Sequence, residues 1–137
     1  MTLAMAFGTF SLIHPGHIYY LERAKSLADK LVVVVARDST VKKVKGKNII
    51  PEEQRRRVVE ALKPVDEAIL GDPSDKYKLI EKYKPDVLVL GPDHSTDELE
   101  GELQRRGLNP KIVKVPKARG KLYKSSQLIK HVCSDER

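Results

Sequence analysis

The stretch LAMAFGTFSLIHPGHIYYLERAKSLADKLVVVVA, residues 3–36, places an amphipathic segment between two apolar runs. The runs LAMAF (3–7) and LVVVVA (31–36) lack the polar alternation of half-exposed strands, so we expect strands that are buried on both faces of a parallel sheet. Residues 18–29 carry apolar side chains at helical spacing, and Pro15 lies where a first helical turn tolerates proline. The stretch therefore predicts a strand–helix–strand unit with a right-handed crossover.

The rest of the chain repeats this alternation. We expect further buried strands at residues 67–70, 86–90 and 111–115, and further helices at residues 52–62, 76–83, about 98–106 and 126–132. The pattern predicts an α/β fold: a single doubly wound, Rossmann-like parallel sheet of five strands with helices on both faces. One domain over residues 1–137 accounts for the whole chain.

Composition narrows the class of protein. The chain is 40% hydrophobic and 33% charged, as soluble globular proteins are, and none of its apolar runs approaches the roughly 20 residues of a membrane helix. Its first residues lack the basic and long apolar regions of a signal peptide, so we expect a cytoplasmic protein without a membrane partner. Cys133 is the one cysteine, and it can form neither an internal disulfide nor a zinc pattern.

The formal charge of +7 favours an anionic partner. Basic residues concentrate in two segments, 41–57 and 105–130, and the second has nine basic residues and no acidic one. The two segments either coat a surface or converge on one phosphate-rich ligand.

The turn GTFSLIHPGH, residues 8–17, follows the first expected strand, which is where a phosphate-binding turn lies in such a sheet. No G-x-G-x-x-G follows this strand, and no G-x-x-x-x-G-K-[ST] occurs in the chain. Gly8 allows close approach of backbone to a ligand, and Gly16 removes a side chain at the helix start. His14 and His17 supply donors beside unpaired helix N–H groups, so the turn predicts a phosphate site built on imidazoles.

A Gly-Thr-Phe turn followed by His-x-Gly-His resembles the signature of the nucleotidyltransferase superfamily, which includes glycerol-3-phosphate cytidylyltransferase, phosphopantetheine adenylyltransferase and class I aminoacyl-tRNA synthetases. The segments VARDSTVKKVKGKNIIPEEQRRRVVEALKPVDEAILG (35–71), PDVLVLGPDH (85–94) and YKSSQLIK (123–130) resemble the small archaeal-type FAD synthases, which transfer AMP from ATP to FMN. The resemblance implies ATP and FMN as substrates, Mg²⁺ or another divalent cation arriving with ATP, no tightly bound protein-liganded metal, and a possible homodimer.

The resemblance also implies roles for individual residues. His14, His17 and Lys45 are the implied catalytic residues, and Lys43 and Arg119 are possible phosphate contacts. For one of the two histidines, the alternative is a helix-terminus histidine satisfied by backbone. Packing is the alternative role for Phe10 and Tyr123, and capping is the alternative for Asp93, Ser125 and Ser126. For Lys43, Lys45, Arg119 and Arg55 the alternative is solvated surface. The implied nucleotide-binding residues are Thr9, Phe10, His14, Pro15, Gly16, His17, Asp93, Tyr123, Ser125 and Ser126.

Two positions depart from the family pattern. Ser11 stands where the superfamily usually has Asp, which affects how the turn is braced or the metal held. His94 stands where an amide is expected, which leaves base or flavin selectivity open.

Two other functions stay open. One is a related cytidylyltransferase or adenylyltransferase acting on another small phosphate, such as glycerol 3-phosphate. The other is a non-catalytic nucleic-acid-binding module, against which stand both histidines and the lack of an aromatic-rich basic stripe, so we expect no nucleic-acid partner. An isoalloxazine ring prefers an aromatic or apolar slot, for which the candidates are Tyr19, Tyr20, Tyr77, Tyr83 and Tyr123.

Overall fold

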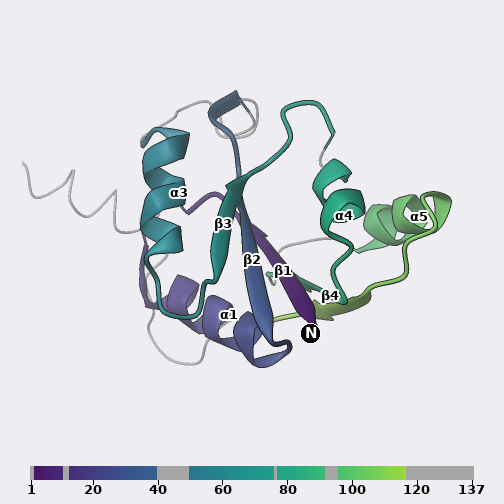
Figure 1. Cartoon of the computed structure of the whole chain (residues 1–137), viewed down its shortest axis with the longest axis horizontal. Helices are drawn as coiled ribbons and strands as arrows, with labels where there is room; N and C mark the ends of the chain where they lie inside the picture. Colours follow the sequence, from purple (N-terminus) through teal and green to yellow (C-terminus); the bar gives the residue numbers. More distant parts are fainter. Residues whose placement is uncertain (1, 11–12, 40–49, 76, 92–95, 117–137) are drawn as a thin grey trace, which may run out of the picture.

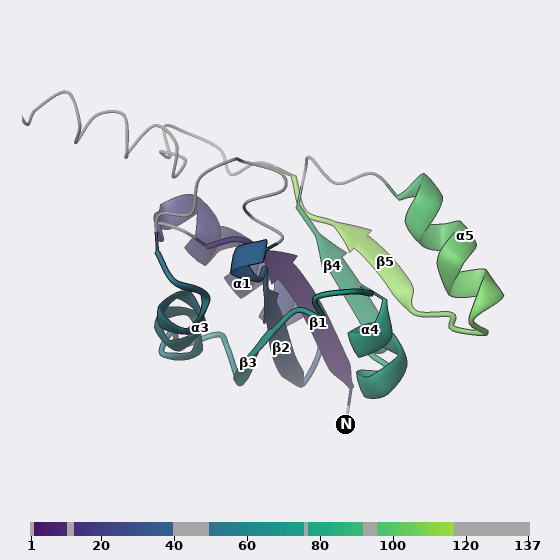
Figure 2. The same cartoon turned by 90° about the horizontal axis from the view of Figure 1, so that it is seen from above.

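The computed structural model describes residues 2–10, 13–39, 50–75, 77–91 and 96–116. Within them the chain forms one five-stranded sheet in the order β3-β2-β1-β4-β5, and all neighbouring strands are parallel (Figures 1 and 2). The predicted parallel sheet of five strands is confirmed. The strands are β1 (Leu3–Gly8), β2 (Lys30–Val35), β3 (Glu67–Leu70), β4 (Val87–Leu90) and β5 (Lys111–Lys114).

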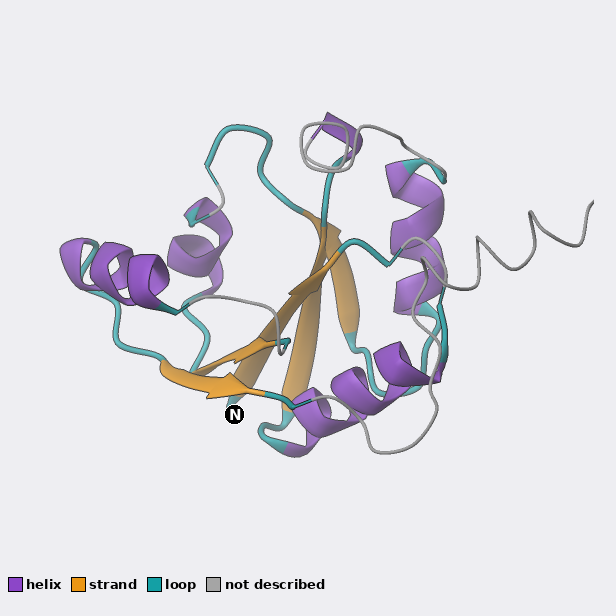
Figure 3. Cartoon of the chain, turned by 180° about the vertical axis from the view of Figure 1, so that it is seen from behind, coloured by secondary structure: helices purple, strands orange, loops and turns teal. Residues whose placement is uncertain are grey.

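Helices cover both faces of the sheet, as the sequence predicts (Figure 3). Two of them, α1 (Pro15–Ser26) and α3 (Glu52–Glu60), pack on one face. The other two, α4 (Lys78–Tyr83) and α5 (Asp97–Arg105), pack on the opposite face. The fold is therefore a doubly wound, Rossmann-like α/β sheet.

The central strands supply side chains to both hydrophobic cores. Along β1, Ala4 and Ala6 face α1 and α3, whereas Met5 between them faces α4 and α5. All three side chains are fully buried. Because successive residues of a strand point to opposite faces, a strand covered on both sides needs an apolar residue at every position. This explains why the runs in the sequence show no alternation.

The strands lie within one residue of their predicted positions, but the helix boundaries differ more. The first helix begins at Pro15 instead of residue 18, because His14 caps it and Pro15 fills its first position. It ends at Ser26 instead of residue 29. Helix α3 ends two residues before its predicted end, and α4 begins two residues after its predicted start. Helix α5 begins and ends one residue earlier than predicted. The predicted helix over residues 126–132 lies outside the described residues.

The order of the strands reverses its direction between β1 and β4. The chain builds β1, β2 and β3 outward through α1 and α3, and then crosses back past β1 through α4 to reach β4. Ligands of doubly wound sheets bind at the carboxyl ends of the strands where this reversal occurs. Here those ends are Gly8 of β1 and Leu90 of β4.

Among the helices that the structure describes, none combines the length and the apolar character needed to cross a membrane.

Candidate active site

The turn after β1 depends on a glycine next to a folded-back aromatic ring. Phe10 has a φ of 54°, and its side chain is buried in the core beneath α1. A Cβ atom on Gly8 would lie 2.6 Å from Cε2 of Phe10, closer than any real contact. Gly8 therefore lets the ring pack against the end of β1. The side chain of Phe10 serves packing, while contact between its backbone and a nucleotide stays a prediction.

Arg55 holds this turn from below. Its side chain is 1% exposed, and its Nη1 donates to the carbonyl oxygens of Thr9 and Ala36, each at 2.8 Å. Its Nε donates to the carbonyl of Ile50 and its Nη2 to the carboxylate of Asp38, also at 2.8 Å. The expectation that Arg55 is either solvated or a ligand contact is therefore wrong. Its guanidinium is buried because it satisfies backbone carbonyls of segments that follow β1 and β2 and precede α3.

His14 and His17 form a reciprocal cap at the start of α1. The Nδ1 atom of His14 accepts a hydrogen bond from the backbone N–H of Gly16 at 3.1 Å. The Nδ1 atom of His17 accepts one from the backbone N–H of His14 at 3.3 Å. The two ring centroids are 4.0 Å apart, and the His17 ring lies 5.3 Å from that of Phe10. The two imidazoles are thus held together at a helix N-terminus, beside the strand reversal.

These hydrogen bonds fix the tautomer of both neutral rings. An imidazole nitrogen that accepts a hydrogen bond carries no proton, so each neutral ring carries its proton on Nε2. Burial lowers the pKa of His14 below its usual value, which favours the neutral form near pH 7. In this tautomer the Nδ1 atom of each ring holds the backbone of the turn and the ring proton lies on Nε2.

The lowered pKa of His14 makes stability depend on pH. The unfolded chain, in which this histidine has its usual pKa of 6.5, binds more protons in mild acid than the folded chain does. The stability from neutral His14 is complete above that value and is lost as the pH falls through it toward the folded pKa. Between about pH 7.5 and 5.5, we expect Tm to fall more in the wild type than in His14→Ala, measured by calorimetry. An equal fall in both proteins would contradict this assignment.

Gly16 leaves room for the ring of His14. A Cβ atom at Gly16 would lie 2.8 Å from Cε1 and 3.0 Å from Nδ1 of that imidazole. We therefore expect Gly16→Ala to displace the ring and lower kcat by about 10- to 100-fold, with Tm changed by only a few degrees. Gly101→Ala in α5 is the matched control, because nothing lies within 4 Å of its added Cβ. Unchanged kcat in Gly16→Ala would show that the ring tolerates the methyl group.

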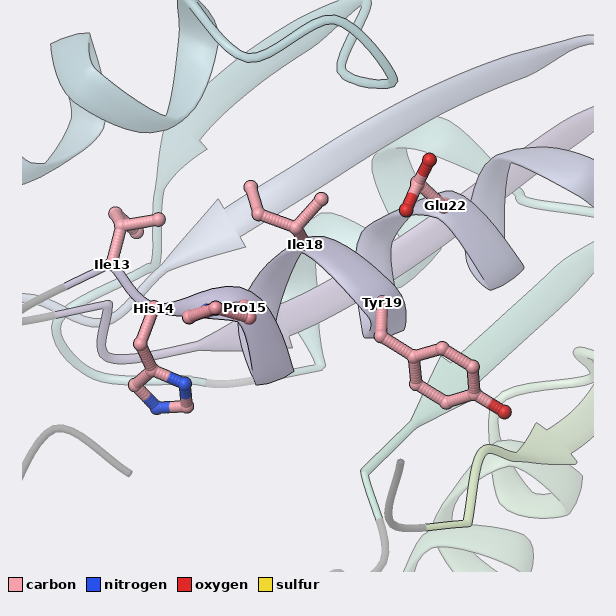
Figure 4. A pocket seen from close by; sticks show the side chains of 6 residues that line it. All are labelled: Ile13, His14, Pro15, Ile18, Tyr19 and Glu22. Carbon is pink, nitrogen blue, oxygen red and sulfur yellow. The ribbon is translucent and has the colours of Figure 1, made fainter. Parts of the chain in front are cut away.

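A hollow of about 460 Å³ adjoins His14 along the first turns of α1 (Figure 4). In this view the rings of His14 and Tyr19 project to the same side of the helix. The volume of this hollow is within the usual range for small-molecule sites. The hollow therefore offers a ligand a partly apolar surface next to an imidazole. It is lined by Ile13, His14, Pro15, Ile18, Tyr19 and Glu22.

The described arginines of the two basic segments do not converge on one ligand. Arg55 belongs to α3 and Arg106 directly follows α5, and these two helices lie at opposite sides of the molecule (Figures 1 and 2). Four of these arginines pair with carboxylates, so for these four the alternative of convergence on one phosphate-rich ligand is not supported. The pairs are Arg55 with Asp38, Arg56 with Glu53 and Glu60, Arg105 with Glu102, and Arg106 with Asp75, Glu81 and Glu102.

The structure brings together one group of the predicted site residues. Thr9, Phe10 and residues 14–17 share the carboxyl edge of β1 and the start of α1. The other predicted site residues and the two departures from the family pattern lie outside the described residues. These are Ser11, Lys43, Lys45, Asp93, His94, Arg119, Tyr123, Ser125, Ser126 and also Cys133.

Two residues that support the site carry no obvious sequence signal. Arg55 is one of three consecutive arginines. The only hint in the sequence is that it precedes the apolar Val59 by four residues, which places both on the same face of the helix. Tyr20 lies three residues after His17 and is one of five tyrosines that we considered for a flavin slot. Its hydroxyl instead bonds the backbone of β1 and β4. Tyr77 and Tyr83 pack on the opposite face of the sheet.

Within the described residues, no group of three or more His, Cys, Asp or Glu side chains is arranged to hold a metal ion.

Comparison with known proteins agrees with this geometry. The cytidylyltransferase-like family model matches residues 5–131. A FAD synthase of Ferroglobus placidus is 54% identical over 96% of this chain and 88% of its own length, and one of Archaeoglobus profundus is 52% identical over 96% and 86%. A crystal structure described as the lipopolysaccharide core biosynthesis protein of Thermoplasma volcanium is 44% identical, with a TM-score of 0.81 over 86% of this chain and 98% of that one. The histidine-capped turn therefore belongs to a nucleotidyltransferase, and the chain is a member of the cytidylyltransferase-like family, in its group of archaeal FAD synthases.

Proposed function

We propose that this chain transfers AMP from ATP to FMN, giving FAD and pyrophosphate. The observation that carries the proposal is the pair of imidazoles that cap α1 beside the ends of β1 and β4. The high identity to proteins named FAD synthase supports the choice of substrates.

The reaction needs alignment more than it needs a base. A phosphate oxygen of FMN attacks the α-phosphorus of ATP, a new P–O bond forms, and the bond from that phosphorus to the β-bridging oxygen breaks. Pyrophosphate leaves with the electron pair of the broken bond. Because the attacking oxygen is already charged, no side chain has to remove a proton. Catalysis then consists of positioning the reactants and stabilising negative charge.

The described residues suit that task. In our proposal the Nε2–H groups of His14 and His17 donate to oxygens of the α-phosphate, where negative charge is redistributed during the transfer. The N-terminus of α1 adds the positive end of its helix dipole. The turn of Thr9 and Phe10 would support the nucleotide from the end of β1.

The remaining contacts in the proposal come from residues implied by the family resemblance. Lys45, with Lys43 and Arg119 as further candidates, would offset charge on the departing pyrophosphate. Asp93 and Tyr123 would contact the nucleoside, and the hydroxyl groups of Ser125 and Ser126 would bind the outer phosphates. Each of these roles is open to test by single substitution.

We also propose that Mg²⁺ or another divalent cation enters with ATP. When bound, it would neutralise phosphate charge at the site. Its ligands would be phosphate oxygens and water.

The deciding experiment is an end-point assay with Mg²⁺ in which the nucleotide and the acceptor are varied separately. ATP or CTP is offered with FMN, glycerol 3-phosphate, phosphopantetheine or a sugar 1-phosphate, the last because of the description of the Thermoplasma volcanium neighbour. We expect FAD and pyrophosphate from ATP and FMN. A product from another pair would reject FMN as the acceptor while keeping the transfer of a nucleotidyl group.

Three wider properties belong to the same proposal. Residues 1–137 form one nucleotidyltransferase domain, which the family match over residues 5–131 supports. The protein acts in the cytoplasm, and it forms a homodimer, as the family resemblance suggests. Cell fractionation tests the cytoplasmic location, and light scattering tests the homodimer.

A further inference from the structure

The hydroxyl of Tyr20 joins three elements at the strand reversal. It donates to the carbonyl oxygen of Val89 in β4 at 2.6 Å and accepts from the backbone N–H of Phe7 in β1 at 3.3 Å. The tyrosine itself belongs to α1. One oxygen atom thus connects the helix that carries the histidine pair to both strands at which the strand order reverses.

The position of this contact along each element matters. Phe7 comes directly before Gly8, where the turn begins, and Val89 comes two residues before Gly91, where β4 has ended. Tyr20 follows His17 by three residues, so the two side chains lie about one helical turn apart on neighbouring parts of α1. The two hydrogen bonds of the hydroxyl therefore restrain both the rotation of α1 about its helix axis and its position along that axis, relative to the end of β4.

The hydroxyl of Tyr20 is protonated at neutral pH, as a tyrosine hydroxyl ordinarily is. The half-buried ring packs against the core beneath α1, and burial raises the pKa of Tyr20 well above its usual value. A protonated phenol can donate to Val89 and accept from Phe7 at the same time. Phenylalanine would keep the ring in the core but leave both contacts unmade.

We propose that Tyr20 is a positioning residue for the adenylyl transfer, because its hydroxyl sets the separation between the histidine pair and the carboxyl end of β4. This inference rests on the proposed function, in which one nucleotide spans both places. A displacement of the order of 1 Å between groups that must meet in a transition state can cost about 100-fold in rate. The effect should therefore appear in kcat more than in the binding of ATP.

The test compares Tyr20→Phe with Tyr83→Phe, which removes a hydroxyl from α4 on the opposite face of the sheet. Both proteins are assayed at a temperature where circular dichroism shows them folded. For Tyr20→Phe we expect kcat to fall at least about tenfold, with less than about a threefold change in KM for ATP. For Tyr83→Phe we expect wild-type kinetics. Wild-type kcat in Tyr20→Phe would overturn the proposal.

A double-mutant cycle with His17→Ala separates positioning from general support of the fold. If Tyr20 acts through the histidine pair, the loss caused by Tyr20→Phe shrinks when His17 is already absent. An equal fold loss in both backgrounds would show that the hydroxyl acts independently of that histidine, and would overturn the proposal.

A spectroscopic measurement keeps this inference distinct from the choice of substrate. If the wild type makes no FAD, the proposed function fails before any variant is compared. The imidazole resonances of His14 and His17 in the free protein then decide the role of Tyr20. We expect them to shift in Tyr20→Phe and to stay in place in Tyr83→Phe. Unchanged resonances in Tyr20→Phe would contradict the positioning role.

Discussion

Replacing either His14 or His17 with alanine is expected to lower kcat for FAD formation by about 10²- to 10³-fold. Each substitution removes an Nε2–H donor that the site holds in a fixed direction through its Nδ1 hydrogen bond. Such a donor stabilises charge that moves in the transition state without having to reorganise. Because the cap of α1 is also lost, we expect a Tm lower by a few degrees. Initial rates of FAD and pyrophosphate release, followed by chromatography, measure the effect on kcat.

His14→Asn separates catalysis from capping. The carbonyl oxygen of asparagine can accept from the N–H of Gly16, since asparagine is a good N-cap residue, but its short side chain does not reach the position of Nε2. We expect Tm near that of the wild type and kcat as low as in His14→Ala. Arg23→Ala, at an exposed position in the last turn of the same helix, is the control with unchanged kcat. More than about a tenth of the wild-type kcat in either alanine variant would argue against the assigned role.

Replacing Arg55 with methionine is expected to destabilise the protein by about 3–5 kcal/mol, because three partly buried carbonyl acceptors each lose a hydrogen bond from a charged donor. The carbonyl oxygens of Thr9, Ala36 and Ile50 would lose their donor, and Asp38 its cation. In a chain of this length such a loss lowers Tm by about 10–20 °C. Thermal and denaturant unfolding, monitored by circular dichroism, measure the change.

Arg57→Met is the matched control, because Arg57 lies two residues further along α3 and is exposed. An exposed substitution of this kind changes stability by about 0.5 kcal/mol or less. If both methionine variants unfolded at the same temperature, the buried guanidinium would contribute nothing to the stability of the fold. In the cold, where Arg55→Met remains folded, we expect reduced kcat because the turn after β1 is no longer held.

The strands and the fold class follow directly from the sequence. A central strand covered on both faces needs unbroken apolar residues, and LVVVV in β2 shows this pattern clearly. The start of α1 is harder to place from periodicity, since His14, Pro15 and Gly16 are not part of an apolar stripe. Their signal is that of a cap, in which an imidazole takes the place of the usual serine, threonine or aspartate.

The supporting residues of the site could not be predicted in the same way. The role of Arg55 depends on carbonyl groups of Thr9 and Ala36, which are 46 and 19 positions away in the chain. Backbone carbonyls exist at every residue, so the sequence contains no letter that marks these two as acceptors. Tyr20 presents the same difficulty, because its partner Val89 is 69 residues away and contributes only its backbone. The histidines were predictable since their chemistry and spacing are local.

The contact between Arg55 and Thr9 also bears on the order in which the site is assembled. The residues from β1 to β2 contain the turn after β1 and its two histidines, yet the side chain that holds Thr9 in place comes from α3. A chain that has folded only as far as β2 therefore has an incomplete turn. We expect local opening of α3 to release this turn as well, so that the two segments open together although α1 and β2 separate them in the sequence.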